Sequence, residues 1–375
     1  MTRVFSAFVL VGLGAFLYQV LGQHPEKGWQ AYLVNFVLWS AVSQGALLFS
    51  VVLHVTKARW GKPLQGLSEA FAGFFPVSFV LYLLLFPGRA FVFPWLEGDL
   101  HGKEAWLSIP FLFLRDTAGL LILYGLGFAY LYHGLKLKRG LREASGKTEA
   151  AWHRRMNVIA VLYIMAYALV LSLLAYDLVM SADLHWISTL FAPYAFVKAF
   201  YLGLGALIVV AAFLRIRHRE AASLTSSHFH DLGKLFFAFC LLWADFFYCQ
   251  FLVIWYGNLP EETNYVIQRT MMLPWSRLAW AVFILSFVLP FLILLNKQVK
   301  TKPLFMVGLC SVVFFGIWLE HFLLLGPALN PGATSLPMGI TDVLITLGFL
   351  GLVGMAVRFA LGRFPELFSV QQEVK

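Results

Sequence analysis

A short acidic segment, residues 176–194, separates two long apolar runs and reads YDLVMSADLHWISTLFAPY. It holds two carboxylates, Asp177 and Asp183, beside His185, and it contains no lysine or arginine. Carboxyl and imidazole groups take up and release protons, and partial burial with mutual repulsion raises the proton affinity of clustered carboxylates. The segment therefore indicates proton exchange at a tight reversal between two apolar segments.

Three further ionisable residues lie near the ends of later apolar runs: Glu320, His321 and Asp342. The sequence predicts that they gather with the three ionisable residues of the acidic segment in one cluster, with no basic residue adjacent in sequence. One interpretation is a site of proton release, or the wall of a quinol pocket. The other is a set of polar loop ends that face water and cap helices, with Asp183 capping the helix that follows it.

Four charged residues lie near the middle of apolar runs, namely Arg115, Asp116, Lys198 and Asp245. A charge in the hydrocarbon region costs several kcal/mol unless it is paired or hydrated. Two cations and two anions at one depth predict mutual neutralisation, and adjacent Arg115 and Asp116 should find partners on different helices. Two interpretations stay open. The residues form structural ion pairs, or Asp245 or Asp116 exchanges protons in a relay while Lys198 tunes its proton affinity.

The elements that position these groups follow from composition. The 375-residue chain is 60% hydrophobic and 13% charged, with a mean hydropathy of +0.78. Its apolar runs are long enough to cross a hydrocarbon core about 30 Å thick. Backbone N–H and C=O groups must be hydrogen-bonded there, which a helix achieves within itself and a sheet only as a closed barrel. We expect one all-α polytopic domain, residues 1–375, with a retained first span rather than a signal peptide. The ten predicted spans are 4–22, 32–55, 70–89, 106–133, 156–180, 187–214, 233–256, 277–296, 303–325 and 340–361.

Basic residues predict the orientation of the spans. Sixteen lysines and arginines lie in the connections after spans 2, 4, 6 and 8, against five in the other connections. Because cytoplasmic loops carry the excess of basic residues, both termini are expected in the cytoplasm and residues 176–194 on the outer face. The net charge of +9 then follows from topology, and we expect no nucleic-acid partner.

Cysteine and histidine usage limits the cofactors. The three cysteines, Cys240, Cys249 and Cys310, all fall inside predicted spans and form no CxxC motif, so this chain alone is not expected to hold an iron–sulfur cluster or zinc. The histidines lack the spacing with which four histidines hold two b-haems. We therefore expect no metal and no redox centre in this chain, with a b-haem subunit and an autonomous secondary transporter as remaining alternatives.

Two strings carry a resemblance to a known family: MSADLHWISTLFAPYAF at 180–196 and HDLGKLFFAFCLLWADFFYCQFLVIWYGNLPEET at 230–263. With the shorter IWLEHFLLLGP at 317–327, they resemble motifs of the F-type membrane subunit of bacterial alternative complex III. The chain departs from the family at Leu184, where a proline is usual, and Asp245 is not a family position. The motif positions that the resemblance points to are Asp177, Asp183, His185, His230, Asp231, Lys234, Glu261 and Glu262.

The resemblance implies a polysulfide-reductase-C or NrfD-like fold, with two four-helix bundles (spans 2–5 and 6–9) flanked by spans 1 and 10. It implies a respiratory complex of the bacterial inner membrane that oxidises quinol and passes electrons to a cytochrome c type acceptor. Iron–sulfur clusters and c-type haem would lie in partner subunits, beside an NrfD-like C-type membrane subunit. This chain would anchor those subunits among membrane lipid and provide a proton path. The alternative is a quinol-binding subunit of another iron–sulfur oxidoreductase, in which a carboxylate and His185 accept the quinol protons.

Overall fold

The fold is that of a helical, multi-pass membrane protein, as the sequence predicts. The computed structural model describes residues 2–100, 102–140, 146–217 and 224–367, and every secondary-structure element within these ranges is helical. Ten of these segments are long and apolar enough to cross a membrane. They are α1 (Thr2–Val20), α2 (Pro25–Val55), α3 to α4 (Lys62–Leu83), α6 (Ile109–Gly140), α7 (Gly146–Leu178), α8 (Phe191–Arg217), α9 (Ser226–Gly257), α11 to α12 (Trp275–Leu295), α14 (Pro303–Leu329) and α15 (Ile340–Arg363).

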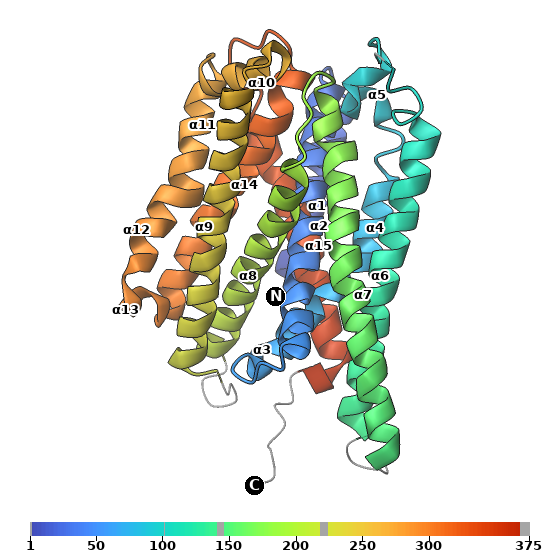
Figure 1. The fold of residues 1–375 in the computed structure, drawn as a ribbon, viewed down its shortest axis with the longest axis vertical. Helices are drawn as coiled ribbons and strands as arrows, with labels where there is room; N and C mark the ends of the chain where they lie inside the picture. The colour runs from blue at the N-terminus through green and yellow to red at the C-terminus, as the bar shows by residue number, and fades with distance from the viewer. Residues whose placement is uncertain (1, 101, 141–145, 218–223, 368–375) are drawn as a thin grey trace.

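Short elements mark the two ends of the molecule (Figure 1). One end carries α5 (Arg89–Val92), η2 (Pro94–Leu96), η3 (Met180–Ala182) and α10 (Pro260–Thr270), and we call it the α10 end. The opposite end carries α3 (Lys62–Glu69), α13 (Lys297–Lys300) and η5 (Pro365–Leu367), and we call it the α3 end. The acidic segment 176–194 lies at the α10 end, because it joins the end of α7 to the start of α8.

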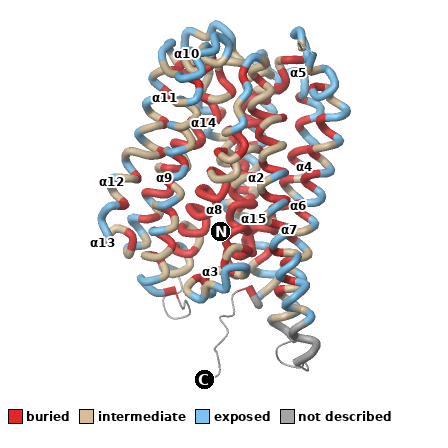
Figure 2. The backbone as a smooth tube through the Cα atoms, in the orientation of Figure 1, coloured by how far each residue is buried: buried red, intermediate tan, exposed pale blue. Residues whose placement is uncertain are grey.

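The centre of the molecule is the contact between α2 and α8. Their backbones touch at two glycines: a Cβ atom on Gly45 would lie 1.9 Å from the carbonyl oxygen of Ala199, and one on Gly203 would lie 2.1 Å from the backbone of Gly45. Small residues let membrane helices approach this closely. Figure 2 shows the resulting buried core along α2 and α8. The approach brings polar groups of the two helices to opposite sides of one interior space.

The remaining helices cover this centre on three sides. α4 (Phe75–Leu83), α6 and α7 pack on one side. On the other side α9 and α14 pack against α8, and α11 (Trp275–Phe283) packs against α14. α1 and α15 pack mainly against each other; α1 also packs against α2, and α15 packs against η1 (Ala70–Phe74) and α2. The core is continuous through α2 and α8, so the division into two four-helix bundles stays a prediction.

Two predicted spans are interrupted at prolines, which cannot donate a backbone hydrogen bond inside a helix. Span 3 is broken by a 3₁₀ segment, η1 (Ala70–Phe74), just before Pro76. Span 8 contains a π segment, η4 (Ile284–Val288), before α12 (Leu289–Leu295) and Pro290. Four residues before that proline, the freed carbonyl oxygen of Ser286 lies 3.8 Å from the Cys240 thiol. Both interruptions have a local cause in the sequence.

The connection after α9 is a surface helix, α10, at the place that its proline and acidic residues predict. Pro260 lies in its first turn with Glu261 and Glu262, which suit a helix N-terminus. Leu259 is the capping residue, whereas Asn258 ends α9 in the left-handed conformation with φ of +47°. Asparagine tolerates this conformation, so Asn258 ends α9 and does not cap α10.

Candidate functional site

A buried ion pair between α8 and α14 forms the centre of the candidate site. The Glu320 carboxylate accepts hydrogen bonds from Lys198 Nζ (2.6 Å), the Tyr194 hydroxyl (2.6 Å) and Trp243 Nε1 (3.0 Å). Lys198 is 5% exposed and Glu320 is 1% exposed. Tyr194 and Lys198 lie one turn apart on α8, and Trp243 comes from α9. Because three donors from two helices hold the carboxylate, the charge of Lys198 is neutralised in a fixed geometry.

The next residue, His321, offers an unused proton acceptor. Its Nδ1 lies 2.7 Å from the carbonyl oxygen of Ile317, and a carbonyl can only accept, so Nδ1 carries the hydrogen. Its Nε2 is buried and has no hydrogen-bond partner among the described residues. In the neutral ring Nε2 therefore presents a lone pair in the protein interior.

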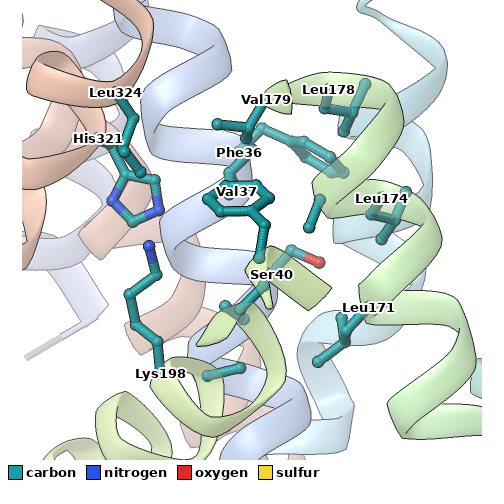
Figure 3. Close-up of a pocket in the computed structure, with 15 residues that line it drawn as sticks. Phe36, Val37, Ser40, Leu171, Leu174, Leu178, Val179, Lys198, His321 and Leu324 are labelled. Carbon is teal, nitrogen blue, oxygen red and sulfur yellow. The ribbon is translucent and has the colours of Figure 1, made fainter. Parts of the chain in front are cut away.

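His321 and Lys198 line a small cavity of about 50 Å³ between α2, α7, α8 and α14. Figure 3 shows the imidazole ring and the lysine ammonium directed toward one another, with the Ser40 hydroxyl across the space. One water molecule needs roughly 10–15 Å³ of such volume, so the cavity has room for a few. Most of its wall is apolar, and its polar groups come from these three side chains. The arrangement suits brief protonation of the imidazole.

Buried hydroxyl and amide groups continue from the cavity into the α2 side. The Ser40 hydroxyl lies 3.4 Å from that of Tyr124, which donates to Ser78 Oγ at 2.9 Å. One turn further along α2, the Tyr163 hydroxyl donates to Gln44 Oε1 at 2.8 Å. Hydroxyl groups both donate and accept, as a proton relay requires. These five side chains therefore form a polar row in an apolar core.

A second polar group lies nearer the α3 end. The Ser50 hydroxyl donates to Glu69 Oε1 at 2.9 Å and lies 3.0 Å from the Tyr130 hydroxyl. Ser50 follows Gln44 by six residues, about 9 Å along a helix axis. The two polar groups are therefore separated by a step longer than one hydrogen bond.

At the α10 end, α10 covers the ion pair with an aromatic and cationic stack. The Trp186 and Tyr265 rings stack at 3.8 Å with an interplanar angle of 10°, and the Arg269 guanidinium lies 3.5 Å from the Tyr265 ring centre. The Tyr265 hydroxyl is buried without a hydrogen-bond partner in the described chain. Burial raises the pKa of Tyr265 to about 12, against the opposing effect of Arg269. This hydroxyl thus stays protonated near neutral pH.

Arg269 also supplies the cation for Asp183. Its Nη1 lies 3.4 Å from Asp183 Oδ2, and its Nη2 donates to the carbonyl oxygen of Leu324 at 2.8 Å. Asp183 does not cap the next helix, because α8 begins eight residues later at Phe191. The predicted capping role is therefore wrong, and Asp183 instead ties the acidic segment to α10.

A separate ion pair joins α6 and α7. Arg115 binds both carboxylate oxygens of Asp177 at 2.7 Å, and Trp106 Nε1 donates to Asp177 Oδ1 at 3.0 Å. The adjacent Asp116 is fully buried and accepts from the Tyr82 hydroxyl at 3.3 Å, while its Oδ1 has no hydrogen-bond partner among the described residues. Arg115 and Asp116 do find partners on different helices, as predicted. One arginine thus lies beside two interacting carboxyl groups.

The predicted single acidic cluster is wrong. Asp177, Asp183 and Glu320 each have their own basic partner, which comes from another helix. Asp342 instead accepts the backbone N–H of Gly339 at 2.7 Å and caps α15. His185 is exposed at the α10 end. Tertiary contacts neutralise the carboxylates that lacked a basic neighbour in the sequence.

The predicted neutralisation of Asp245 within the chain is also wrong. Lys198 pairs with Glu320 and Arg115 with Asp177, while Asp245 is exposed on α9 and its closest described polar contact is the Cys249 thiol at 3.9 Å. It lies in an exposed stripe of α9 with Leu241, Leu242, Tyr248 and Trp255. Asp245 therefore faces outward in the middle of a span.

The remaining family-motif residues contribute no side chain to the ion pair or its cavity. At the start of α9, Lys234 Nζ lies 3.0 Å from Asp231 Oδ1, and His230 Nδ1 lies 3.7 Å from the same oxygen. Glu261 and Glu262 lie in the first turn of α10. The two groups are thus separated by the length of α9, and neither contributes a side chain to the cavity.

Several site residues were missed at the level of sequence. Ser40 and Gln44 of α2, with Tyr124 and Tyr163, form the polar row, and Tyr265 covers the ion pair. A signal existed for α2, since Ser40, Ser43 and Gln44 interrupt an apolar run. Within the described ranges, no group of three His, Cys, Asp or Glu residues is placed to hold a metal ion.

No protein-family model matches this chain, and no curated protein is significantly similar to it in sequence. The sequence motifs and the geometry of the buried polar groups are therefore the basis for assigning a function.

Proposed function

We propose that this chain is an integral membrane subunit of a quinol-oxidising respiratory complex of the alternative complex III type, and that it conducts protons. The observation that carries the proton role is the unpartnered Nε2 of His321. It faces a cavity of about 50 Å³ between the Lys198–Glu320 ion pair and the Ser40 hydroxyl. An acceptor, a space large enough for water and a fixed ion pair are the parts that a buried relay needs.

The relay works through groups that accept and donate in turn. A proton taken up by His321 Nε2 places a second cation beside Lys198, whose charge is already matched by Glu320. A buried, unmatched charge is costly, so the proton does not stay on the imidazole. Water in the cavity then passes it toward the hydroxyls of Ser40 and Tyr124. The longer step from Gln44 to Ser50 limits the rate on this side.

On the other side, hydroxyl groups lead from the ion pair toward the α10 end. The Tyr194 hydroxyl donates to Glu320, and the Tyr265 hydroxyl is near enough to Glu320 and Asp183 to interact electrostatically with both. Asp183 is only partly buried and connects this side to water. We place the α10 end outside the bacterial inner membrane, because the basic connections lie at the α3 end.

Electron transfer belongs to other subunits in this proposal. Iron–sulfur clusters and c-type haem lie in peripheral partners, and an NrfD-like C-type membrane subunit holds the quinol site. The exposed position of Asp245 supports a membrane partner, because a carboxylate facing lipid in mid-span costs several kcal/mol. A helix that carries a lysine, an arginine or hydroxyl groups would cover the α9 stripe and remove that cost.

The alternative, a quinol site in this chain beside His321, is less well supported. The cavity of about 50 Å³ is roughly one third of the volume that admits benzene in a protein interior, on the order of 150 Å³. A quinol ring is larger than benzene because it carries two hydroxyl groups. The cavity size therefore favours water and protons over a quinol.

The test is purification of the complex from native membranes followed by reconstitution in lipid vesicles. Co-purification of iron–sulfur and c-haem chains is expected, and Glu320→Gln, measured in complexes that still assemble despite the broken ion pair, should lower proton movement per electron while quinol oxidation continues. Glu26→Gln is the matched control, since Glu26 lies at the start of α2 away from the cavity. Isolation of the chain without redox partners would contradict the assignment to a complex, and equal proton movement in both variants would contradict the relay.

A further inference from the structure

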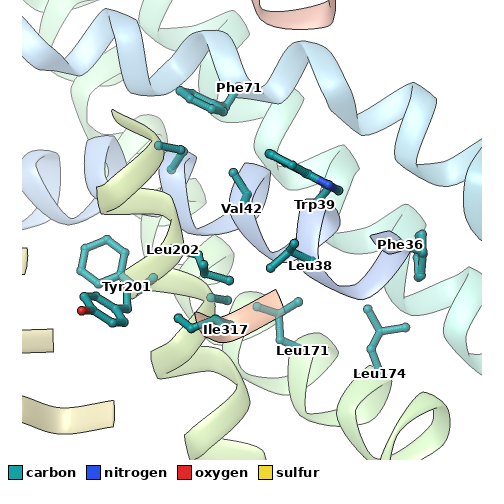
Figure 4. Packing of buried hydrophobic residues seen from close by; sticks show 14 of the residues in the cluster. Phe36, Leu38, Trp39, Val42, Phe71, Leu171, Leu174, Tyr201, Leu202 and Ile317 are labelled. Atoms are coloured by element: carbon teal, nitrogen blue, oxygen red, sulfur yellow. The ribbon is translucent and has the colours of Figure 1, made fainter. Parts of the chain in front are cut away.

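A long apolar crevice lies on the membrane face between α2, α8, α14 and α15. Its volume is about 800 Å³, and it runs along α15 from Val343 to Leu361. The rise along the helix from residue 343 to residue 361 is about 27 Å, close to the thickness of a hydrocarbon core. Figure 4 shows Trp39, Val42 and Phe71, which line it, among the packed side chains of this region. Its size and length match lipid acyl chains.

One charged side chain lines this crevice. Arg358 is exposed there, five residues before the end of α15, and it forms no ion pair with the described part of the chain. The hydroxyls of the two other polar lining residues, Ser311 and Thr346, donate to carbonyl oxygens of their own helices. An arginine at this depth needs an anion or must reach the interface with its long side chain. The guanidinium is thus available to an acidic ligand at the α3 side of the crevice.

Two indole groups in the crevice wall also lack acceptors. Trp39 Nε1 and Trp318 Nε1 are buried and make no hydrogen bond within the described ranges. A buried N–H without an acceptor costs about 1–3 kcal/mol. Carbonyl oxygens of a bound molecule would satisfy these donors.

The depth of Trp39 relative to Arg358 follows from ring contacts and helix direction. α1 and α15 run antiparallel, because Gln19 near the end of α1 bonds Thr341 near the start of α15, while Ser6 bonds Met355. α2 follows α1 in the opposite direction, so it runs parallel to α15. The Tyr32 ring contacts that of Phe349 at 5.4 Å. Seven residues further on, Trp39 therefore lies near the depth of residue 356, on the order of 3 Å from that of Arg358.

We propose that this crevice binds a glycerophospholipid whose phosphate contacts Arg358 and whose ester carbonyls accept hydrogen bonds from Trp39 and Trp318. In such a lipid the phosphate and the esters are adjacent, which matches the similar depth of the guanidinium and the Trp39 indole. The acyl chains extend along α15 toward Val343. The site uses none of the proton-relay side chains, so it stands independently of the proposed function.

The test is native mass spectrometry of the purified full chain in mild detergent, with added phosphatidylglycerol or with a diacylglycerol of the same acyl chains. The chain should retain phosphatidylglycerol and lose diacylglycerol, which lacks the phosphate. Arg358→Gln should lower phosphatidylglycerol retention roughly ten-fold or more, the effect of losing a hydrogen bond to a charged group. Arg363→Gln, on the same helix but outside the crevice, should not lower it.

A second substitution tests the indole contacts. Trp39→Phe keeps an aromatic ring against Phe314 and removes only the N–H donor and part of the ring system. It should weaken phosphatidylglycerol retention, whereas Trp280→Phe on an exposed face should not. Equal retention by Arg358→Gln and the unmodified chain, or equal retention of the two lipids, would overturn the proposal. So would a protein partner in the crevice that leaves no lipid bound.

Discussion

Removal of the negative charge at Glu320 should destabilise the fold, and simultaneous removal of the Lys198 charge should cost less than the two single changes added together. Glu320→Gln leaves the Lys198 ammonium buried without a counter-charge. The new glutamine amide also has one NH₂ group in place of an oxygen. That group must face either Trp243 Nε1 or the Lys198 ammonium and the Tyr194 hydroxyl. Since all of these groups donate, at least one existing hydrogen bond becomes a contact between two donors.

The magnitude follows from burial. Lys198 and Glu320 are 5% and 1% exposed, so water cannot replace the lost partner. Breaking a buried ion pair by removing one member costs about 3–5 kcal/mol. Replacing both members removes the unmatched charge, so Lys198→Met with Glu320→Gln should cost less than the sum of the single changes. We expect a coupling free energy of about 2 kcal/mol, within the range for residues in direct contact.

The assay is equilibrium unfolding in mixed micelles with an increasing mole fraction of sodium dodecyl sulfate, followed by circular dichroism. The four proteins of the double-mutant cycle give the coupling free energy directly. Asp231→Asn with Lys234→Met is a matched control, because that ion pair is on the surface of α9 and surface pairs contribute roughly 0–1 kcal/mol. Additive losses at the buried pair would refute the reasoning, since they would show that the two charges do not depend on each other.

Further predictions concern packing, the covering helix, the second ion pair and the exposed carboxylate. Gly45→Leu should prevent folding, because a Cβ atom would already lie 1.9 Å from the Ala199 carbonyl oxygen, and yield of folded protein by gel filtration measures this. Tyr265→Phe should slow proton movement equally across pH 6–9, because a phenol with a pKa of about 12 stays protonated throughout; a changed pH profile would contradict this. Arg115→Lys should cost roughly 1–3 kcal/mol in unfolding measurements, because lysine cannot bind both oxygens of Asp177. Asp245→Leu should leave the isolated chain folded but reduce recovery of its membrane partner, and unchanged recovery would show that α9 is not the interface.

The spans were predictable from sequence because hydropathy is a local property. Ten long apolar runs predict ten helices, and the structure has them, with interruptions where Pro76 and Pro290 remove a backbone donor. The start of α10 is ambiguous in the sequence by one residue, because Asn258 suits both a helix start and the left-handed end of α9, which is the place it takes in the structure. The local sequence therefore predicts the presence of a helix more reliably than the residues at which it begins and ends.

The charge pairing was not predictable, because each partner is remote in the chain. Lys198 and Glu320 are 122 residues apart, Arg269 and Asp183 are 86 apart, and Arg115 and Asp177 are 62 apart. Because no lysine or arginine is adjacent in sequence to Asp177, Asp183 or Glu320, the sequence predicts a cluster of carboxylates without cations. Which helices face one another decides which cations neutralise which carboxylates, and one sequence contains no direct record of that.

For Asp245 the sequence predicts a cation partner, and the structure shows none among the described residues. Its depth in an apolar run correctly suggests a costly charge, but depth does not say which side of the helix is buried. Trp243, two residues earlier, points into the core and contacts Glu320, whereas Asp245 is exposed. On a helix, residues two apart differ in direction by about 200°, so one faces the site and the other faces away.

The central claim is that His321 accepts and releases a proton between the Lys198–Glu320 ion pair and the polar row of α2. The most direct measurement is the number of protons moved per electron by the complex from native membranes, reconstituted in vesicles, with His321→Phe compared with the unmodified chain. We expect quinol oxidation and subunit composition to be maintained while proton movement falls, because phenylalanine fills the site without a nitrogen. An unchanged number of protons per electron in the folded, assembled variant would contradict it.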